Sequence, residues 1–301
     1  MESGQEGQQL QLRNLTDQDL IASEHFWTEE LGFDMARNHM RRWHLVDPEG
    51  FFGIFLGDTL IATGAAVKQT SELFFIGSIG VRESHRGKGL CRQIINRLFE
   101  RCPEGTFALF AVPECIQMYR KLGFEIVDNG TAYVYGGRAA TLPSDNIKSA
   151  FRFEVVDSNK PELVRRLIEY DARLHGFERP IGTTLIDDDD GSTVVCSMEG
   201  SIVGFVRIAS SKRDGGAFIG PLYADYSEVA YLLLEDILVR NRAQAEISVS
   251  IFVSSRGGFL AEKLKLELRD DYPKCCTNPD RIPTMEVDKI FAFDSTDFAI
   301  C

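Results

Sequence analysis

The chain has 301 residues, of which 44% are hydrophobic and 26% are charged, and its formal net charge is −12. This composition excludes a wholly disordered chain, because enough apolar surface is available to offset the entropy lost on ordering, and the length predicts two domains. Both halves are acidic, which argues against a nucleic-acid-binding protein, since such proteins need a basic surface to neutralise phosphates.

The first half of the chain predicts helices around a mostly antiparallel sheet. Residues 10–15 alternate apolar and polar side chains as a strand does, and Thr16 is expected to cap a helix with acidic residues in its first turn. The other expected elements are a helix over 34–43, strands over 51–56, 60–68, 72–81 and 107–112, helices over 90–101 and 114–122, and a closing hairpin of 124–127 with 132–135.

The second half repeats this order of elements after a polar stretch at 139–149, which we interpret as a linker. Strands are expected over 151–156, 193–198, 202–210, 217–223 and 246–253, and helices over 161–174, 227–240 and 258–268. The shared order predicts a diverged tandem duplication, with one domain over 10–138 and a second over 150–301.

A glycine-rich turn follows the strand that ends near Val81 and opens the next helix. Gly87 and Gly89 let backbone N–H groups point into one concavity, which together with the helix dipole binds a phosphate, and Arg86 and Lys88 add positive charge. The turn is not a Walker A loop, because glycine rather than Ser or Thr follows Lys88. It is not a dinucleotide fingerprint either, because Arg92 stands where the third glycine is required.

The segment RGKGLC, residues 86–91, resembles the pyrophosphate loop of the GNAT superfamily of N-acetyltransferases, with Cys91 where that family usually has Gly or Ala. A second segment, YRKLGF at 119–124, follows the next strand and resembles a later motif of the same family. Residues 47–52 and 219–225 resemble a narrower subgroup, in which an acetyltransferase domain is followed by an atypical acetyltransferase-like domain.

This resemblance implies an α+β protein built of tandem acyl-CoA N-acyltransferase folds, each a mixed, mostly antiparallel sheet flanked by helices. It also implies acetyl-CoA as the cofactor, with the pantetheine arm in a wedge between the strands ending near Val81 and Val112. The residues expected to bind the cofactor are Ile79, Val81, Arg86, Gly87, Lys88, Gly89, Leu90 and Cys91.

One catalytic residue is expected from the same resemblance, and a second from its position at the start of the strand that leads to the site. Tyr119 is the general acid that reprotonates the leaving thiolate, since a phenol is a fair match for a thiolate in pKa. Glu72 is the candidate general base, with Ser78, His85 or a chain of water molecules as alternatives. The second half lacks the loop: residues 222–227 hold no glycine, and Asp225 would repel a phosphate, so the site is confined to the first domain.

The function expected is transfer of an acetyl group from acetyl-CoA directly to an amine of a small molecule or a protein, in a ternary complex. No cysteine of the first half has a His and a carboxylate in a recognisable triad, which argues against a covalent enzyme intermediate. The alternative is a non-catalytic CoA-binding sensor, or an interaction protein built from degenerate acetyltransferase folds.

Several features make other sites and locations unexpected. The seven cysteines form no CxxC pair, the five histidines are dispersed, and no run of apolar residues approaches the roughly 18 of a membrane span. No metal, nucleic acid or membrane is therefore expected, and the expected location is an intracellular, reducing compartment, the cytoplasm or the nucleus. The sequence gives no indication of the oligomeric state or of which amine is the acceptor.

Overall fold

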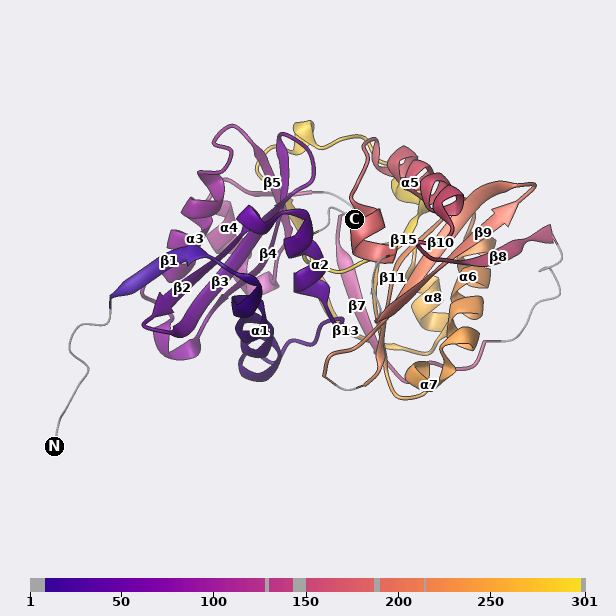
Figure 1. The fold of residues 1–301 in the computed structure, drawn as a ribbon, viewed down its shortest axis with the longest axis horizontal. Coiled ribbons are helices and arrows are strands. Elements are labelled where there is room, and N and C mark those ends of the chain that lie inside the picture. The colour runs from indigo at the N-terminus through magenta and orange to yellow at the C-terminus, as the bar shows by residue number, and fades with distance from the viewer. Residues whose placement is uncertain (1–8, 128–129, 143–149, 187–189, 214, 299–301) are drawn as a thin grey trace.

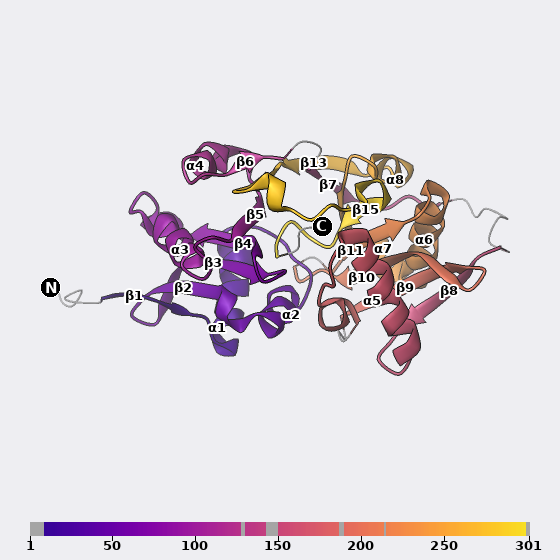
Figure 2. The same ribbon diagram turned by 90° about the horizontal axis from the view of Figure 1, so that it is seen from above.

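The computed structural model describes residues 9–127, 130–142, 150–186, 190–213 and 215–298. These residues form two sheets that lie side by side, each with helices packed against it (Figures 1 and 2). This arrangement confirms the expected α+β class with tandem, mostly antiparallel sheets.

The first sheet has seven strands in the order β1-β2-β3-β4-β5-β14-β6. Its neighbouring strands are antiparallel except β4 and β5, which run parallel. The strands are β1 (Leu10–Asn14), β2 (Phe51–Leu56), β3 (Thr59–Lys68), β4 (Leu73–Val81), β5 (Thr106–Phe110), β6 (Glu125–Ile126) and β14 (Lys274–Cys276).

Helices cover both faces of this sheet because successive strand residues point to opposite sides. Phe52 and Ile54 of β2 pack in one core with α3, whereas Phe51 and Phe55 pack in another core with α1 and α2. The helices are α1 (Asp17–His25), α2 (His39–Val46), α3 (Leu90–Phe99) and the short α4 (Ile116–Arg120). The second of these begins at His39, later than expected, because Asn38 before it adopts a left-handed conformation.

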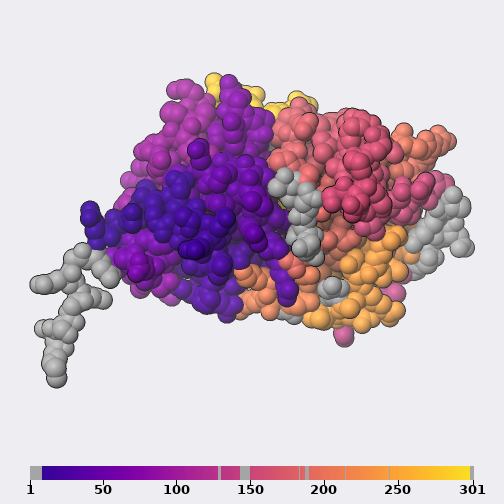
Figure 3. Space-filling view, in the orientation of Figure 1, coloured from indigo at the N-terminus to yellow at the C-terminus, as the bar shows by residue number. Residues whose placement is uncertain are grey.

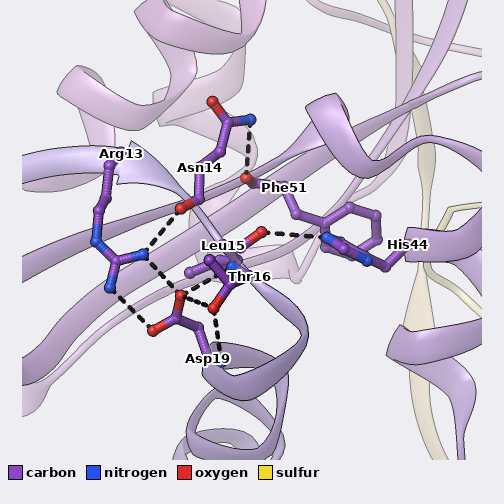
Figure 4. Close-up of polar contacts among 7 residues, drawn as sticks. All are labelled: Arg13, Asn14, Leu15, Thr16, Asp19, His44 and Phe51. Carbon is purple, nitrogen blue, oxygen red and sulfur yellow. Dashed lines mark hydrogen bonds and ion pairs between the residues drawn. The ribbon is translucent and has the colours of Figure 1, made fainter.

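Thr16 caps α1 as its sequence predicts (Figure 4). The Asp19 carboxylate accepts the backbone N–H of Thr16 at 2.8 Å, and the Thr16 hydroxyl accepts the N–H of Asp19 at 3.4 Å. Arg13 donates to both oxygens of Asp19, at 2.6 and 2.9 Å, and this guanidinium holds the pKa of the carboxyl well below its usual range. His44 of α2 lies 3.1 Å from the Leu15 carbonyl, which ties α2 to the same corner.

The second sheet has eight strands in the order β13-β7-β12-β15-β11-β10-β9-β8. The long α6 packs its apolar side chains on β9, β10 and β11, and α5 packs in a second core with Phe205 and Tyr223. The strands are β7 (Ala132–Gly137), β8 (Arg152–Val156), β9 (Gly191–Met198), β10 (Ser201–Ser210), β11 (Ala217–Ala224), β12 (Val249–Val253), β13 (Glu267–Tyr272) and β15 (Ile290–Phe293). The helices are α5 (Pro161–His175), α6 (Ser227–Arg240), α7 (Arg242–Ala245) and α8 (Gly258–Lys263).

The two sheets exchange strands. β7 pairs with β12 and β13, and β14 pairs with β5 and β6, so each sheet contains a strand from the other half of the chain. The expected hairpin of residues 124–127 with 132–135 is therefore wrong, because an apolar run predicts a strand without naming its partner. The expected helix over 258–268 is also too long, since β13 begins at Glu267. Most of the expected linker, residues 143–149, lies outside the described residues.

The last described residues return to the first domain. After β15, Phe298 enters the core formed by α1, α2 and β2, where it is fully buried. Gln69 donates a hydrogen bond from Nε2 to the Phe298 carbonyl at 2.8 Å. In the space-filling view, yellow atoms from late in the chain lie along the upper edge where the two halves meet (Figure 3). The C-terminal segment thus fastens one domain to the other.

Candidate functional site

Strands β4 and β5 separate partway along their length. They pair from Leu73 with Thr106 to Phe75 with Ala108, and beyond this point residues 76–81 of β4 pair with β3 whereas β5 pairs with β14. In the part of the chain that the structure describes, the edge of β4 that faces β5 is thus left without a partner strand. This is the wedge expected from the sequence, and Ile79 and Val81 lie on its open edge, both half-buried.

A bulge distorts β4 at Ser78. The register with β3 shifts between Thr63 and Ala65, and Ser78 has a φ of 49°, a conformation that is rare for a residue with a side chain. Thr63 donates to the Ser78 carbonyl at 3.1 Å, whereas the Ser78 N–H turns to Oδ1 of Asp297 at 2.9 Å. The bulge therefore turns the Ser78 N–H away from β3 and toward Asp297, and local distortions of this kind are typical of functional sites.

The glycine-rich turn lies at the mouth of the wedge. Gly87 and Gly89 have φ values of 75° and 76°, and a Cβ at either position would meet nothing within 4 Å, so their backbone borders open space. Gln93 donates to the Gly89 carbonyl at 3.1 Å as the first bond of α3, which leaves the N–H groups of Leu90 and Cys91 without intrahelical acceptors. The turn is built as an anion-binding nest.

Two cations of the turn are held by backbone carbonyls. Arg86 donates from Nε to the Val81 carbonyl at 3.2 Å, and Lys88 donates from Nζ to the Ser84 carbonyl at 3.3 Å. Both side chains remain exposed, so their charge is available to an anion at the nest. A cavity of about 460 Å³ opens beside them, lined by Glu30, Leu31, Arg82, Glu83, Ser84 and Arg86.

Tyr119 lies beside the first turn of α3. Its side chain is only 8% exposed, and its ring meets the edge of Phe124 at a centroid distance of 5.6 Å. The Tyr119 carbonyl accepts the N–H of Phe124 at 3.1 Å, which closes the turn that the YRKLGF segment predicts. Burial raises the pKa of Tyr119 well above its ordinary value, and the neighbouring Cys91 thiol adds to this shift. The phenol therefore keeps its proton and remains a donor.

Glu72 is not brought to this site. It is exposed just before β4, at the end of the strand where β4 and β5 are still paired, and its carbonyl accepts the N–H of Thr106 at 2.7 Å. At about 3.3 Å per residue, this position is roughly 20 Å along the strand from Ser78. His85 is half-buried in a short 3-10 turn, with Nδ1 2.9 Å from the Ser84 hydroxyl.

The sequence reading missed Asp297, which reaches the wedge from 219 residues away and carries no motif. The residues brought together are therefore the glycine-rich turn, Ile79, Val81 and Tyr119, with Asp297 added at the bulge.

In the second domain, an acidic residue stands before α6, at the position that corresponds to the glycine-rich turn before α3 in the first domain. Asp225 precedes α6, and its Oδ1 lies 3.1 Å from Lys289 Nζ and 3.4 Å from Arg173 Nη2. The negative charge of this carboxylate repels a phosphate, as expected from the sequence, and the two cations beside it are already paired with it. Nearby, Asp171 and Arg179 form a buried ion pair with an Oδ2 to Nε distance of 2.9 Å, so each of these charges already has a partner within the protein.

The described part of the chain holds no cluster of three His, Cys, Asp or Glu side chains arranged for a metal ion. None of its helices is both long and apolar enough to cross a membrane.

Part of the chain that includes this site is similar to a known family. Residues 12–124 match the acetyltransferase (GNAT) family, a range that includes the turn, the wedge and Tyr119. Holothin acyltransferase of Pseudoalteromonas sp. (strain SANK 73390) is 24% identical over 214 residues, which cover 67% of this chain. The chain covers 66% of that relative's own length, slightly less than two thirds.

Solved structures share the fold of the whole chain. A Pyrococcus horikoshii protein described as an acetyltransferase superposes with a TM-score of 0.75 over 99% of both chains, at 18% identity. A tandem GNAT protein from the clavulanic acid biosynthesis pathway has a TM-score of 0.60 at 10% identity, covering 90% of this chain and 99% of its own. N-myristoyltransferase of Saccharomyces cerevisiae with bound myristoyl-CoA also gives 0.60, at 11% identity, over 94% and 88% of the two chains.

Proposed function

We propose that this protein is an N-acetyltransferase that moves the acetyl group of acetyl-CoA directly to an amine, a proposal supported by the match of residues 12–124 to the acetyltransferase (GNAT) family. The observation that carries the proposal is the nest at Gly87 to Cys91, which lies beside the unpaired edge of β4 within the matched range. Along the sequence we assign the CoA-binding domain to residues 10–138 and a diverged domain without the loop to residues 150–301, with β7 and β14 exchanged between the two sheets.

The cofactor fits this geometry in two parts. The N–H groups of the nest, with Arg86 and Lys88 beside them, suit the pyrophosphate of CoA. The open edge of β4 at Ile79 and Val81 suits the amide-rich pantetheine arm, which can bond to backbone groups as a further strand does. The thioester then lies deeper in the wedge, near the bulge at Ser78.

A short acyl group suits the space at the bulge. A Cβ at Gly77 would lie 2.6 Å from Oδ1 of Asp297 and 2.9 Å from the Phe298 ring, so the C-terminal segment packs directly against β4 at Gly77. A long acyl chain that extended past Gly77 on this side of β4 would have to displace Asp297 and the fully buried Phe298. This crowding supports acetyl as the group transferred.

Direct transfer in a ternary complex agrees with the thiols of the site. Burial raises the pKa of Cys91 to about 11, so this thiol is protonated at neutral pH and is a poor nucleophile. We assign Tyr119 to protonate the leaving CoA sulfur. Its raised pKa keeps the phenol protonated at neutral pH but makes it a weaker acid than a free phenol, so the proton transfers only as the thiolate forms beside it. Positioning of the amine against the thioester supplies much of the remaining rate enhancement.

Calorimetry with acetyl-CoA tests the binding site. Gly89→Glu places a negative charge in the nest and should abolish detectable binding, because the phosphates meet a like charge. Gly200→Glu is the matched control: Gly200 also has a positive φ of 82° and open space around it, but it lies in the β9–β10 turn of the second domain. Equal affinity of the Gly89→Glu variant and the wild type would refute the loop assignment.

Turnover separates an enzyme from a non-catalytic CoA-binding sensor. The expected result is release of CoA thiol from acetyl-CoA in the presence of at least one primary amine of a broad panel. Tight binding of acetyl-CoA without turnover across the panel would favour the sensor, and no binding by the wild type would refute both functions.

A further inference from the structure

A carboxylate from the end of the chain lies at the bulge of β4. Asp297 accepts the backbone N–H of Ser78 through Oδ1 at 2.9 Å, and its Oδ2 lies 3.4 Å from the Ser78 hydroxyl. Its Oδ1 would be 2.6 Å from a Cβ at Gly77, so the carboxylate lies directly against the strand that lines the wedge. A residue of the second half of the chain thus completes the site of the first.

The chain around Asp297 holds it in this position. Phe298 is fully buried and its ring stacks on His39 of α2 at 5.3 Å. The Ser295 hydroxyl accepts the N–H of Asp297 at 2.9 Å and donates to its carbonyl at 2.7 Å. Asp297 as a residue is half-buried, and its carboxylate is held in place by these neighbours.

No Lys or Arg among the described residues forms a salt bridge with this carboxylate, and charged groups taken out of water are usually paired. Burial raises the pKa of Asp297, and its hydrogen bonds to Ser78 oppose the shift only in part. Tyr119 and Tyr272 are the titratable groups that Asp297 acts on, while His39 stacks on the adjacent Phe298. Burial is the main cause of the raised pKa of both tyrosines, and the charge of Asp297 adds to it. An unpaired carboxylate with a raised pKa is typical of a functional group.

We infer that Asp297 is the general base of this site and that its natural acceptor is a cationic amine, which the carboxylate attracts and deprotonates. This inference rests on the proposed function. Glu72, the base expected from the sequence, lies at the other end of β4, whereas Asp297 lies at the bulge and within electrostatic reach of Tyr119. The base and the acid of the reaction are then Asp297 and Tyr119, contributed by the two halves of the chain.

The proton and electron movements balance as follows. The ammonium of the acceptor gives one proton to Asp297, and its freed lone pair forms the C–N bond at the acyl carbon of acetyl-CoA. The C–S bond breaks, its electron pair leaves with the sulfur, and Tyr119 gives that sulfur a proton. A second proton of the attacking nitrogen returns to Tyr119 through water, and Asp297 releases its own proton to solvent.

The test uses Asp297→Asn in the full chain. Asparagine keeps an oxygen for the Ser78 N–H but cannot accept a proton, so the fold and the affinity for acetyl-CoA should be retained. With the best acceptor among tyramine, spermidine and a lysine peptide, kcat should fall at least 100-fold at neutral pH. The activity that remains should rise continuously with pH, because only amine already deprotonated in solution reacts. Asp288→Asn, an exposed change of the same charge in the same part of the chain, should be unchanged.

A second measurement does not need a productive acceptor. In ¹³C spectra of protein labelled at aspartate carboxyls, the signal absent from Asp297→Asn identifies Asp297, and it should shift when acetyl-CoA is added. An unchanged kcat of Asp297→Asn would overturn the inference while the proposed function stands. So would an Asp297 carboxyl chemical shift that stays the same when acetyl-CoA binds. If the wild type binds no acetyl-CoA, the proposed function fails first and this inference fails with it.

Discussion

Asp47 and Arg101 form a two-point ion pair that joins the turn before β2 to the end of α3. Arg101 Nη2 lies 2.7 Å from Oδ1 of Asp47, and Nη1 lies 3.0 Å from Oδ2. The same Oδ2 accepts the backbone N–H of Lys68 at 2.8 Å. The side chain of Asp47 is only 9% exposed, and that of Arg101 is only 13% exposed. This pair fixes the end of α3 that lies away from the nest, and so holds the helix whose first turn forms the site.

Asp47→Ala should lower the free energy of unfolding by about 3 kcal/mol, because it leaves the Arg101 guanidinium nearly buried without its partner. Urea denaturation followed by circular dichroism measures the change. Glu100→Ala is the control: it removes an exposed pair with Arg97 and should change stability by less than about 1 kcal/mol. Equal effects of the two substitutions would show that the buried pair contributes no more than a surface pair.

Tyr119→Phe should lower kcat by roughly 100-fold while the affinity for acetyl-CoA stays near that of the wild type, because the variant loses only the proton donor. Phenylalanine preserves the packing against Phe124. Tyr135→Phe in β7 of the second sheet serves as the control and should leave turnover unchanged. A large drop in the melting temperature of Tyr119→Phe with unaltered kcat would instead assign the residue a packing role.

The sequence predicts the nest and Tyr119 because both depend on local chain geometry. Two glycines between a strand and a helix require the conformations seen at Gly87 and Gly89, and the short helix with its YRKLGF turn follows one helix and one strand later. The spacing between the two motifs then places Tyr119 at the start of α3, because the intervening elements have few ways to pack.

The strand exchange and Asp297 could not be predicted in this way. β14 is short and follows β13 almost directly in the sequence. Its partners β5 and β6 lie about 150 residues earlier, so only the tertiary packing determines which strands β14 pairs with. Asp297 is one of 45 acidic residues and has no pattern around it. What distinguishes Asp297 is its contact with the bulge at Ser78, which the folded chain brings together from 219 residues away. The sequence around either residue does not predict this contact.

Phe298→Ala should destabilise the first domain by about 3–5 kcal/mol, the usual effect of removing a large aromatic side chain from a packed core. Phe298 is fully buried among α1, α2 and β2, and its loss should also loosen the position of Asp297. Both the free energy of unfolding and kcat should therefore fall. Leu268→Ala is the control, since that side chain is 55% exposed in β13 and its removal should affect neither measurement. A stable, fully active Phe298→Ala variant would show that the C-terminal segment does not need this anchor.

Asp297→Asn should make the protein more stable at neutral pH, even though it lowers activity. The pKa of Asp297 is raised in the folded state, so the folded chain binds this proton more tightly than the unfolded chain does. The stability contributed by that proton is present below the ordinary carboxyl pKa and is lost as pH rises through the raised value. The melting temperature of Asp297→Asn should therefore exceed that of the wild type at pH 7, and the difference should shrink as the pH falls toward 4. Asp288→Asn, which is exposed, should show no such trend. A difference that is constant with pH, or a less stable variant at pH 7, would mean that the carboxylate is held at the bulge for stability and not for its chemistry.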